Sequence, residues 1–311
     1  MGTNARVTPG FGKIADAQKD AIDRSLPPRT EADLGGSRPR VRATDLLIYA
    51  VLILAGLAFL LPFYWMIVSS FRPTAQFFQI PIPLVPNPPS LENFETLFAR
   101  SMFGQGLFNS AFLAVVSVIL QVWFCALAGY TFAKLRFRGR DPLFIGILTT
   151  MMIPLGVGLI PNFIIMARIG WVDTYQALIV PGIANAFGIF WMRQYCLSVP
   201  DDLLDAARVD GAGEFGIFSR IVLPLIRPAL ASLAIFVFLS SWNDFLAPLV
   251  FLRSEEKFTV QLWLSIVSRQ QNVSQPAIVM AGSLLASIPI VILFGALQRH
   301  FIAGLTAGSV K

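Results

Sequence analysis

The chain has 311 residues, of which 55% are hydrophobic and only 14% are charged. Soluble domains carry about 25% charged residues, so this composition excludes a disordered chain, a nucleic-acid-binding module and a soluble enzyme of ordinary composition. The net charge of +6 is interpreted through membrane topology, because Lys and Arg collect on the cytoplasmic side of membrane proteins. We therefore expect an all-α, multi-pass integral membrane protein.

The N-terminal residues 1–44 are polar, rich in Arg and interrupted by Pro and Gly. This pattern predicts neither a signal peptide nor a membrane span. The first apolar run starts near Leu46 and is too long for the hydrophobic part of a signal peptide. We expect three parts: a cytoplasmic polar tail (1–44) of unassigned function, a transmembrane domain (45–299) and a cytoplasmic C-terminal tail (300–311).

Six stretches are apolar and long enough to cross about 30 Å of hydrocarbon, which takes about 20 helical residues. The six expected spans are 46–70, 107–133, 142–166, 175–197, 229–252 and 277–297. Each prolyl residue within them removes an intrahelical hydrogen bond and favours a kink. These residues are Pro62, Pro154, Pro161, Pro181, Pro248 and Pro289. The Pro-rich connection 71–106 predicts an ordered extracytoplasmic segment rather than a domain.

The distribution of Lys and Arg predicts the orientation of the spans. With six spans, 18 of the 24 basic residues fall in the two terminal tails and in the loops after the second and fourth spans. Four of these residues crowd the short loop 134–140, and short loops weigh most in this rule. We therefore expect both termini to be cytoplasmic.

The cytoplasmic segment 198–228 is too short and polar to span the membrane. Ser198 followed by Asp201 resembles a capping box and predicts a helix start. Gly211 ends that helix after about ten residues, and a second short helix is expected over 214–223. Such a helix–glycine–helix unit suits the docking of a partner protein, and the alternative is a solvated connecting loop.

The same segment resembles the EAA loop of ABC importer permeases. The family pattern is Glu-Ala-Ala, three residues, Gly, nine residues and Ile-x-Leu-Pro. This chain has Asp205-Ala206-Ala207, Gly211 and Ile221-x-Leu223-Pro224 in the same register, with Asp in place of the usual Glu. In the fifth span, Trp242-Asn243-Asp244 resembles the Trp-Asn-Asp/Glu element of carbohydrate permeases. The C-terminal 298–311 resembles the ending of MalG-type subunits.

This resemblance covers about residues 45–311 and implies a six-helix permease subunit with the type I ABC importer fold in the plasma (inner) membrane. It implies a carbohydrate solute, a second homologous permease, two ABC ATPases and an extracytoplasmic solute-binding protein as partners, besides membrane lipids. The implied ATPase-docking residues are Asp205, Ala206, Ala207, Asp210, Gly211, Glu214, Ile221, Leu223 and Pro224. The implied C-terminal ATPase contacts are Gly304, Leu305, Thr306 and Gly308.

The chain contains no Gly-x-x-x-x-Gly-Lys-Ser/Thr phosphate-binding loop, so ATP hydrolysis is expected on partner subunits. Its two cysteines, Cys125 and Cys196, have no disulfide or metal-site spacing and are expected to be small buried hydrophobic residues. We expect no catalytic residue, no metal, no cofactor and no nucleic-acid partner.

Asp244 is the one carboxylate well inside an expected span, where an acidic residue costs about 2.5–3.5 kcal/mol on insertion scales. It should therefore face protein or water. The candidate residues for the solute path are Asn109, Asn185, Asn243 and Asp244. For each, hydrogen bonding between helices is the alternative role.

Three other functions are alternatives to a sugar importer. An ion-coupled secondary transporter usually needs acids or broken helices at the midplane, and Asp244 alone is thin support. An ABC permease for another solute fits the C-terminal residues less well. An intramembrane enzyme would need a nucleophile paired with a base, and the spans contain no such pair.

Overall fold

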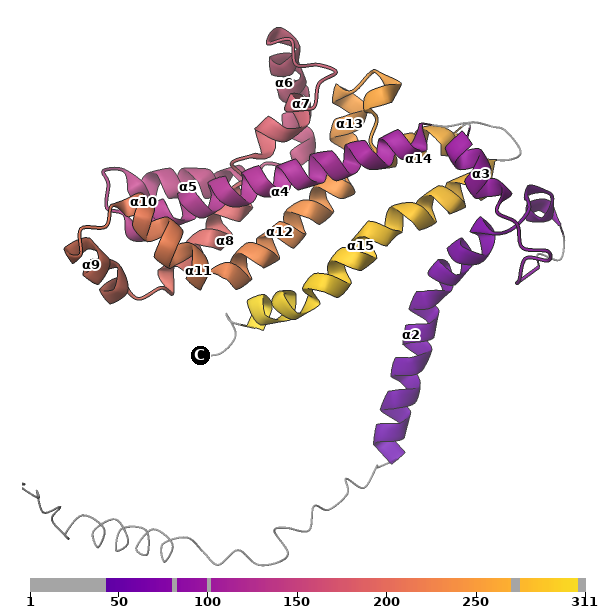
Figure 1. Cartoon of the computed structure of the whole chain (residues 1–311), viewed down its shortest axis with the longest axis horizontal. Coiled ribbons are helices and arrows are strands. Elements are labelled where there is room, and N and C mark those ends of the chain that lie inside the picture. Colours follow the sequence, from indigo (N-terminus) through magenta and orange to yellow (C-terminus); the bar gives the residue numbers. More distant parts are fainter. Residues whose placement is uncertain (1–42, 80–82, 100–101, 270–274, 307–311) are drawn as a thin grey trace, which may run out of the picture. The chain divides into compact units, whose positions relative to one another are not determined.

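A computed structural model describes residues 43–79, 83–99, 102–269 and 275–306 (Figure 1). Every regular element within these ranges is a helix, which confirms the all-α prediction. The chain divides into two compact units, Met1–Leu60 and Leu61–Lys311, and helix α2 (Ala43–Ser70) crosses the boundary between them. The expected N-terminal tail lies outside the described residues, apart from its last two positions.

Three helices in the described ranges are long and apolar enough to cross a membrane: α2, α4 (Phe103–Lys134) and α15 (Gln275–Thr306). They coincide with the first, second and sixth expected spans. A fourth span arises if the pair Glu214–Leu225 and Arg227–Trp242, bent by 82°, counts as one. Because of that bend, we treat only its second helix as membrane-spanning. The count of six spans and the side of each terminus stay predictions.

The third, fourth and fifth expected spans are broken helices. The third consists of α5 (Arg140–Thr150) and α6 (Leu155–Arg168). The fourth consists of α7 (Gln176–Ile179), η3 (Val180–Gly182) and α8 (Ala186–Leu197). The fifth consists of α12 (Arg227–Trp242) and α13 (Leu246–Phe251). Pro154 precedes α6, Pro181 lies in the short 3₁₀ helix and Pro248 lies early in α13. The remaining three prolines lie inside helices that continue past them: Pro62, Pro161 and Pro289.

The core of the larger unit forms where α4 packs against α8 and α12, and α12 also packs against α15 (Figure 1). Two glycines permit the close approach of α4 and α8. A Cβ atom on Gly129 would lie 2.6 Å from the Cβ of Met192, and one on Gly188 would lie 2.7 Å from the Sγ of Cys125. Small residues commonly let membrane helices approach in this way. Both cysteines are buried and free, as expected.

The connection 71–106 is ordered where it is described, with η2 (Thr74–Phe78) and α3 (Glu92–Ala99). The side chain of Asn93 donates hydrogen bonds to the carbonyls of Ser70 and Arg72 and so joins α3 to the end of α2. The buried Arg72 guanidinium lies over the Trp65 ring at 4.9 Å. This connection forms no domain of its own.

A second connection, residues 252–260, is held from two sides. It contains η5 (Glu255–Lys257) and leads into α14 (Val260–Arg269). The Nδ2 of Asn109, on α4, donates to the carbonyls of Glu256 at 2.8 Å and Phe258 at 3.0 Å. Asp173 has a left-handed backbone conformation (φ = 62°), and its Oδ1 accepts a hydrogen bond from the backbone N–H of Ser254 at 3.0 Å. These bonds fix the connection to α4 and to the segment between α6 and α7.

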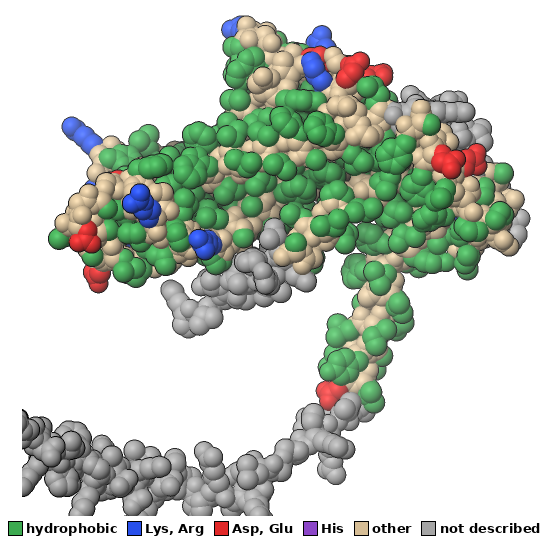
Figure 2. Space-filling model, in the orientation of Figure 1, with side chains coloured by type: hydrophobic (Ala, Val, Ile, Leu, Met, Phe, Trp, Pro, Cys, Tyr) green, Lys and Arg blue, Asp and Glu red, His purple; other side chains and the backbone are tan. Residues whose placement is uncertain are grey.

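Side chains of different kinds gather on different parts of the surface. Figure 2 shows hydrophobic side chains over the long helices of the larger unit, and charged side chains mainly towards its ends. At one end the chain forms α9 (Asp201–Val209), α10 (Glu214–Ile217), the π-helix η4 (Phe218–Val222) and α11 (Leu223–Leu225). A hydrophobic band between charged ends is typical of a protein that spans a bilayer.

Candidate functional site

The two short helices expected over 198–228 are present, and we call residues 198–228 the coupling loop. Helix α9 ends at a glycine in the left-handed conformation, since Gly211 has φ = 81°. The N–H of Ala212 bonds to the carbonyl of Ala207 at 2.9 Å, and that of Gly211 to the carbonyl of Arg208 at 3.0 Å. This bond pair is a Schellman motif. A glycine is therefore required by the backbone at this position of the EAA pattern.

The start of α9 differs from the prediction. The helix begins at Asp201, after Pro200, and no side chain caps it. The Oγ of Ser198 donates instead to the carbonyl of Tyr195 at 2.8 Å. The expected capping box is therefore wrong, because both of its side chains have other partners: Asp201 pairs with Lys134.

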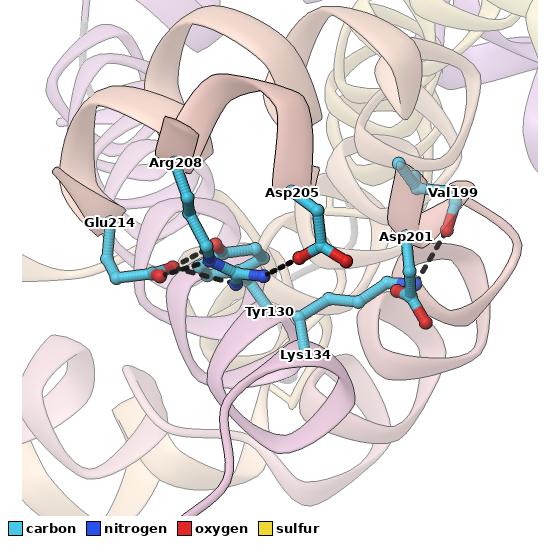
Figure 3. A network of polar contacts seen from close by, with 7 residues as sticks. All are labelled: Tyr130, Lys134, Val199, Asp201, Asp205, Arg208 and Glu214. Atoms are coloured by element: carbon cyan, nitrogen blue, oxygen red, sulfur yellow. Dashed lines mark hydrogen bonds and ion pairs between the residues drawn. The ribbon is translucent and has the colours of Figure 1, made fainter. Parts of the chain in front are cut away.

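A network of charged and polar side chains joins the two short helices of the coupling loop to each other and to α4 (Figure 3). The guanidinium of Arg208 donates to the Oδ1 of Asp205 at 2.7 Å and to the Oε1 of Glu214 at 2.8 Å. The hydroxyl of Tyr130, on α4, donates to the Oε2 of Glu214 at 2.6 Å. Arg208 thus joins the two short helices, and Tyr130 joins the second of them to a membrane-spanning helix.

Lys134 makes the other connection between α4 and the coupling loop. Its Nζ bonds to the carbonyl of Val199 and to the Oδ1 of Asp201, each at 2.6 Å (Figure 3). The Lys134 side chain is only 6% exposed, whereas that of Asp201 is 74% exposed. A buried ammonium held by a carbonyl and a carboxylate orients the loop more strongly than an exposed ion pair does.

The network lowers the pKa of two of its acids, Glu214 and Asp201. The hydrogen bonds from Arg208 and then from Tyr130 hold the pKa of Glu214 below its ordinary value. The hydrogen bond and the charge of Lys134 lower the pKa of Asp201. The pKa of Arg208 is raised, chiefly by Glu214 and next by Asp205. A hydrogen bond or an opposite charge favours the charged form in each case.

The coupling loop has a buried face and an exposed face. Leu204 and Ala207 of α9, together with Ile217 and Phe218, are buried in the core beside α4 and α8. The other face exposes apolar side chains, among which Val209 is 88% exposed. Leu203 of α9 and Phe215 of α10 are exposed as well, and the Phe215 ring also contacts the Trp123 ring of α4.

The structure places the predicted docking residues on both faces. Asp205, Ala206, Asp210, Gly211, Glu214 and Pro224 are exposed, Ile221 and Leu223 are half-buried, and Ala207 is buried. A cleft of about 1020 Å³ lies beside them, between the end of α4 and α9, and is lined by Lys134, Arg136, Arg140, Asp201, Asp205 and Arg208 among others.

A second, smaller groove lies among the broken helices and has a volume of about 340 Å³. It is lined from α4, from the α7–η3 segment, from α12 and from the break that follows α12. Its polar lining residues are Ser117, Gln121, Asn185, Ser240, Ser241, Asp244 and Thr259. The volume falls within the roughly 300–1,000 Å³ of small-molecule sites. We call this feature the polar groove.

Asn185 and Asp244 line the polar groove, and both also cap helices at breaks. The Oδ1 of Asn185 accepts from the N–H of Gly188 at 3.1 Å, and the Oδ1 of Asp244 from the N–H of Ala247 at 3.2 Å. The other two candidates for the solute path lie elsewhere. Asn109 fixes the 252–260 connection, and Asn243 donates to the carbonyl of Leu239 at 2.9 Å.

The C-terminal candidates lie at the end of α15 or beyond it. Gly304, Leu305 and Thr306 occupy its last turn, and Gly308 lies outside the described residues. The helix therefore continues about seven residues into the expected C-terminal tail. No group of three or more His, Cys, Asp and Glu side chains that could hold a metal ion occurs among the described residues.

Sequence reasoning missed the anchors of the coupling loop. Lys134 and Arg208 entered the prediction only as charges that set the orientation, and Tyr130 did not enter it. One feature of the sequence could have indicated Tyr130: it is a tyrosine near the end of an apolar span, and its hydroxyl needs a hydrogen-bond partner once it is buried. The serine and threonine residues of the polar groove could not be singled out from the sequence, because small polar residues within spans are common.

Comparison with known proteins places the chain. Residues 123–306 match the family described as binding-protein-dependent transport system inner membrane component. The arabinooligosaccharides transport system permease protein of Halalkalibacterium halodurans is 39% identical, over 85% of this chain and 97% of that protein. The lactose transport system permease protein of Rhizobium radiobacter is 35% identical, over 88% of this chain and 98% of that protein.

A solved structure agrees with this placement. The crystal structure of a bacterial ABC transporter involved in the import of the acidic polysaccharide alginate contains a chain with a TM-score of 0.78 to this one. The sequences are 27% identical, and the match covers 84% of this chain and 97% of that one. The chain therefore belongs to the family of binding-protein-dependent transport system inner membrane components, and it is a membrane-embedded permease subunit with the ABC importer permease fold rather than an enzyme.

Proposed function

We propose that this chain is one of two permease subunits of an ATP-driven importer for a carbohydrate. The names of the relatives support the solute class, since arabinooligosaccharides and lactose are both sugars. The partners would be a homologous permease, two ABC ATPases and an extracytoplasmic solute-binding protein. The chain itself would supply half of the path across the membrane.

One observation carries this proposal: the coupling loop is joined to α4 by directional polar bonds while an apolar face stays exposed. Tyr130 and Lys134 are the two residues of α4 that make these bonds. A partner that binds the exposed face and moves would therefore displace α4 as well. Such rigid coupling of a docking site to a membrane helix suits alternating access driven from the cytoplasm.

The docking surface for the ATPase would be the exposed face of the coupling loop. The exposed apolar side chains of α9, Leu203 and Val209, are the kind that a protein partner buries. Asp205 would act mainly inside the loop, because it already pairs with Arg208. The end of α15, with Gly304, Leu305, Thr306 and Gly308, would make a second ATPase contact.

The solute path would pass the polar groove, with Asn185 and Asp244 at its wall. Hydroxyl, amide and carboxylate groups supply the hydrogen-bond donors and acceptors that sugar hydroxyl groups need. Asn109 and Asn243 would act structurally, through the backbone carbonyls that they bind.

The test is a purification of the tagged chain from its native membranes in mild detergent, followed by mass spectrometry of what is bound. We expect a second permease of the same family and an ATPase with a nucleotide-binding loop. Sugar uptake by cells with and without the gene then tests the solute class. Recovery of the chain alone across several detergents, with unchanged uptake in the deletion strain, would contradict the proposal and favour an ion-coupled carrier.

A further inference from the structure

The polar groove carries charge of one sign only. Of the seven polar side chains that line it, Asp244 alone is ionisable as an acid, and none is a Lys or an Arg. The rest are hydroxyl and amide groups, which are neutral at every physiological pH. This lining accepts and donates hydrogen bonds but supplies no positive charge to a passing solute.

Asp244 has no basic side-chain partner among the described residues. It is half-buried at the break between α12 and α13, and its Oδ1 accepts a hydrogen bond from the N–H of Ala247. This bond orients the carboxylate without neutralising it. Among the described residues Asp244 takes part in no salt bridge, in contrast to Asp205 of the coupling loop. A charge with no counterion acts on whatever enters the groove.

The surroundings make that charge effective over several ångströms. The wall of the groove is partly apolar and has a lower effective dielectric constant than water, so a charge in it is screened less than a surface charge. An anionic solute would meet repulsion from Asp244 and no basic side chain to offset it. A neutral sugar would meet a strong hydrogen-bond acceptor for its hydroxyl groups.

We propose that the polar groove selects for an uncharged sugar against acidic sugars and phosphate esters. This inference rests on the proposed function, because it assumes that the groove lies on the solute path. Family membership leaves the charge open: arabinooligosaccharides and lactose are neutral, whereas one structural relative serves the import of an acidic polysaccharide. The lining of the groove is what decides between them.

The test uses the whole transporter, reconstituted with its partner permease, ATPases and binding protein. The first probes are arabinotriose, lactose, maltotriose, trigalacturonate and glycerol 3-phosphate, of which only neutral sugars should be taken up. The second probes are the best neutral sugar and its uronic acid derivative, each corrected for its affinity for the binding protein. The wild type should favour the neutral form at least about tenfold, which corresponds to about 1.4 kcal/mol.

Variants then assign this preference to one side chain. Asp244→Asn should reduce the ratio of neutral to uronate uptake by about tenfold, and Asp244→Glu should keep it. The matched control is Glu255→Gln, which removes the same charge from an exposed residue outside the groove and should leave the ratio unchanged.

The outcomes distinguish a failure of the charge selection from a failure of the proposed function. Uptake of acidic probes alone would overturn the charge selection and leave a sugar importer standing. Uptake of no carbohydrate by the intact transporter would overturn the proposed function itself. An unchanged ratio in Asp244→Asn would also reject the role of the groove. If that variant fails to reach the membrane, the wild-type ratio between the neutral sugar and its uronate still decides the question.

Discussion

At the scale of single residues, Gly211 has the most sharply defined requirement, because its φ of 81° suits few residues other than glycine. Gly211→Ala should cost about 1 kcal/mol by the usual penalty for the left-handed conformation. Gly211→Pro should abolish transport, since proline cannot adopt this φ. Sugar uptake and the amount of subunit in the membrane are the two measurements.

The matched control for Gly211 lies two residues further on. Gly213 has φ = −71° and no atom within 4 Å of where a Cβ would be, so Gly213→Ala should transport normally. Equal effects of the two alanine variants would show that the left-handed turn does not matter. Normal transport by Gly211→Pro would remove the docking role of the loop.

Glu214 makes the anchoring of the coupling loop dependent on pH. Its pKa in the folded protein lies below the ordinary 4.5, so its stabilising contribution is complete above about pH 4.5 and is lost as the pH falls below that value. The purified subunit should therefore unfold at a lower temperature at pH 4 than at pH 7. Glu214→Gln should unfold earlier at pH 7 and show a smaller difference between the two pH values.

Asp202→Asn serves as the control for this pH effect. Asp202 lies on the same short helix and is exposed, with no salt bridge among the described residues. The variant should keep the pH dependence of the wild type. If it reduces that dependence as much as Glu214→Gln does, general surface charge rather than the contacts of Glu214 is responsible.

For single residues, the sequence predicted their positions in the coupling loop better than their side-chain bonding partners. The spacing of the EAA pattern placed Asp205 and Gly211 on the loop, and the glycine does end a helix there. The partner of Asp205 could not be predicted, because an acid at this position can face either the loop or another protein. Tyr130 and Lys134 reach the loop from residues far away in the sequence, and such pairs emerge only from tertiary packing.

At the scale of helices, the close contact of α4 with α8 depends on Gly129. A Cβ there would lie 2.8 Å from the backbone N of Arg193, and a backbone atom cannot move aside as a flexible side chain can. Gly129→Ala should therefore destabilise the subunit by about 1–3 kcal/mol, measured as its unfolding temperature in detergent. Gly146→Ala on α5, where the space is open, should have no such effect, and equal losses would contradict this packing.

The end of α15 gives the second prediction at this scale. Removal of residues 304–311 should lower the amount of sugar transported per ATP hydrolysed and leave membrane insertion intact, because the apolar span within α15 ends at Ala296. Uptake and ATPase activity of the reconstituted complex measure this ratio. Deletion of residues 2–30 at the other terminus is the control and should not change it. An unchanged ratio after the C-terminal deletion would rule out the proposed contact.

Periodicity and composition predicted the long helices well and the broken ones poorly. The second span was expected over 107–133, and α4 runs from Phe103 to Lys134. Hydropathy does not register a break when the residues at the break are themselves apolar, as around Met151 and Pro154. At the α12 break the signal was present, since Asn243 and Asp244 are polar residues at the end of an apolar run. They favour helix ends over helix interiors.

At the scale of the whole molecule, the exposed face of the coupling loop should decide assembly with the ATPases. Val209 is 88% exposed, so Val209→Asp should leave the fold of the subunit unchanged while reducing ATPase co-purification by tenfold or more, since about 1.4 kcal/mol is enough for that. Val85→Asp is the control, because Val85 is an exposed valine of the 71–106 connection. Equal ATPase recovery from both variants would refute docking at this face.

The π-helix η4 gives the family spacing a geometrical meaning. A π-helix takes up an extra residue within a turn, and η4 lies between Gly211 and Pro224, inside the segment whose length the EAA pattern fixes. One residue more or less rotates everything after it by about 100° in an α-helix. The number of residues between Glu214 and the motif proline therefore sets the rotational position of α11 relative to α10, at the point where the chain bends by 82° into α12.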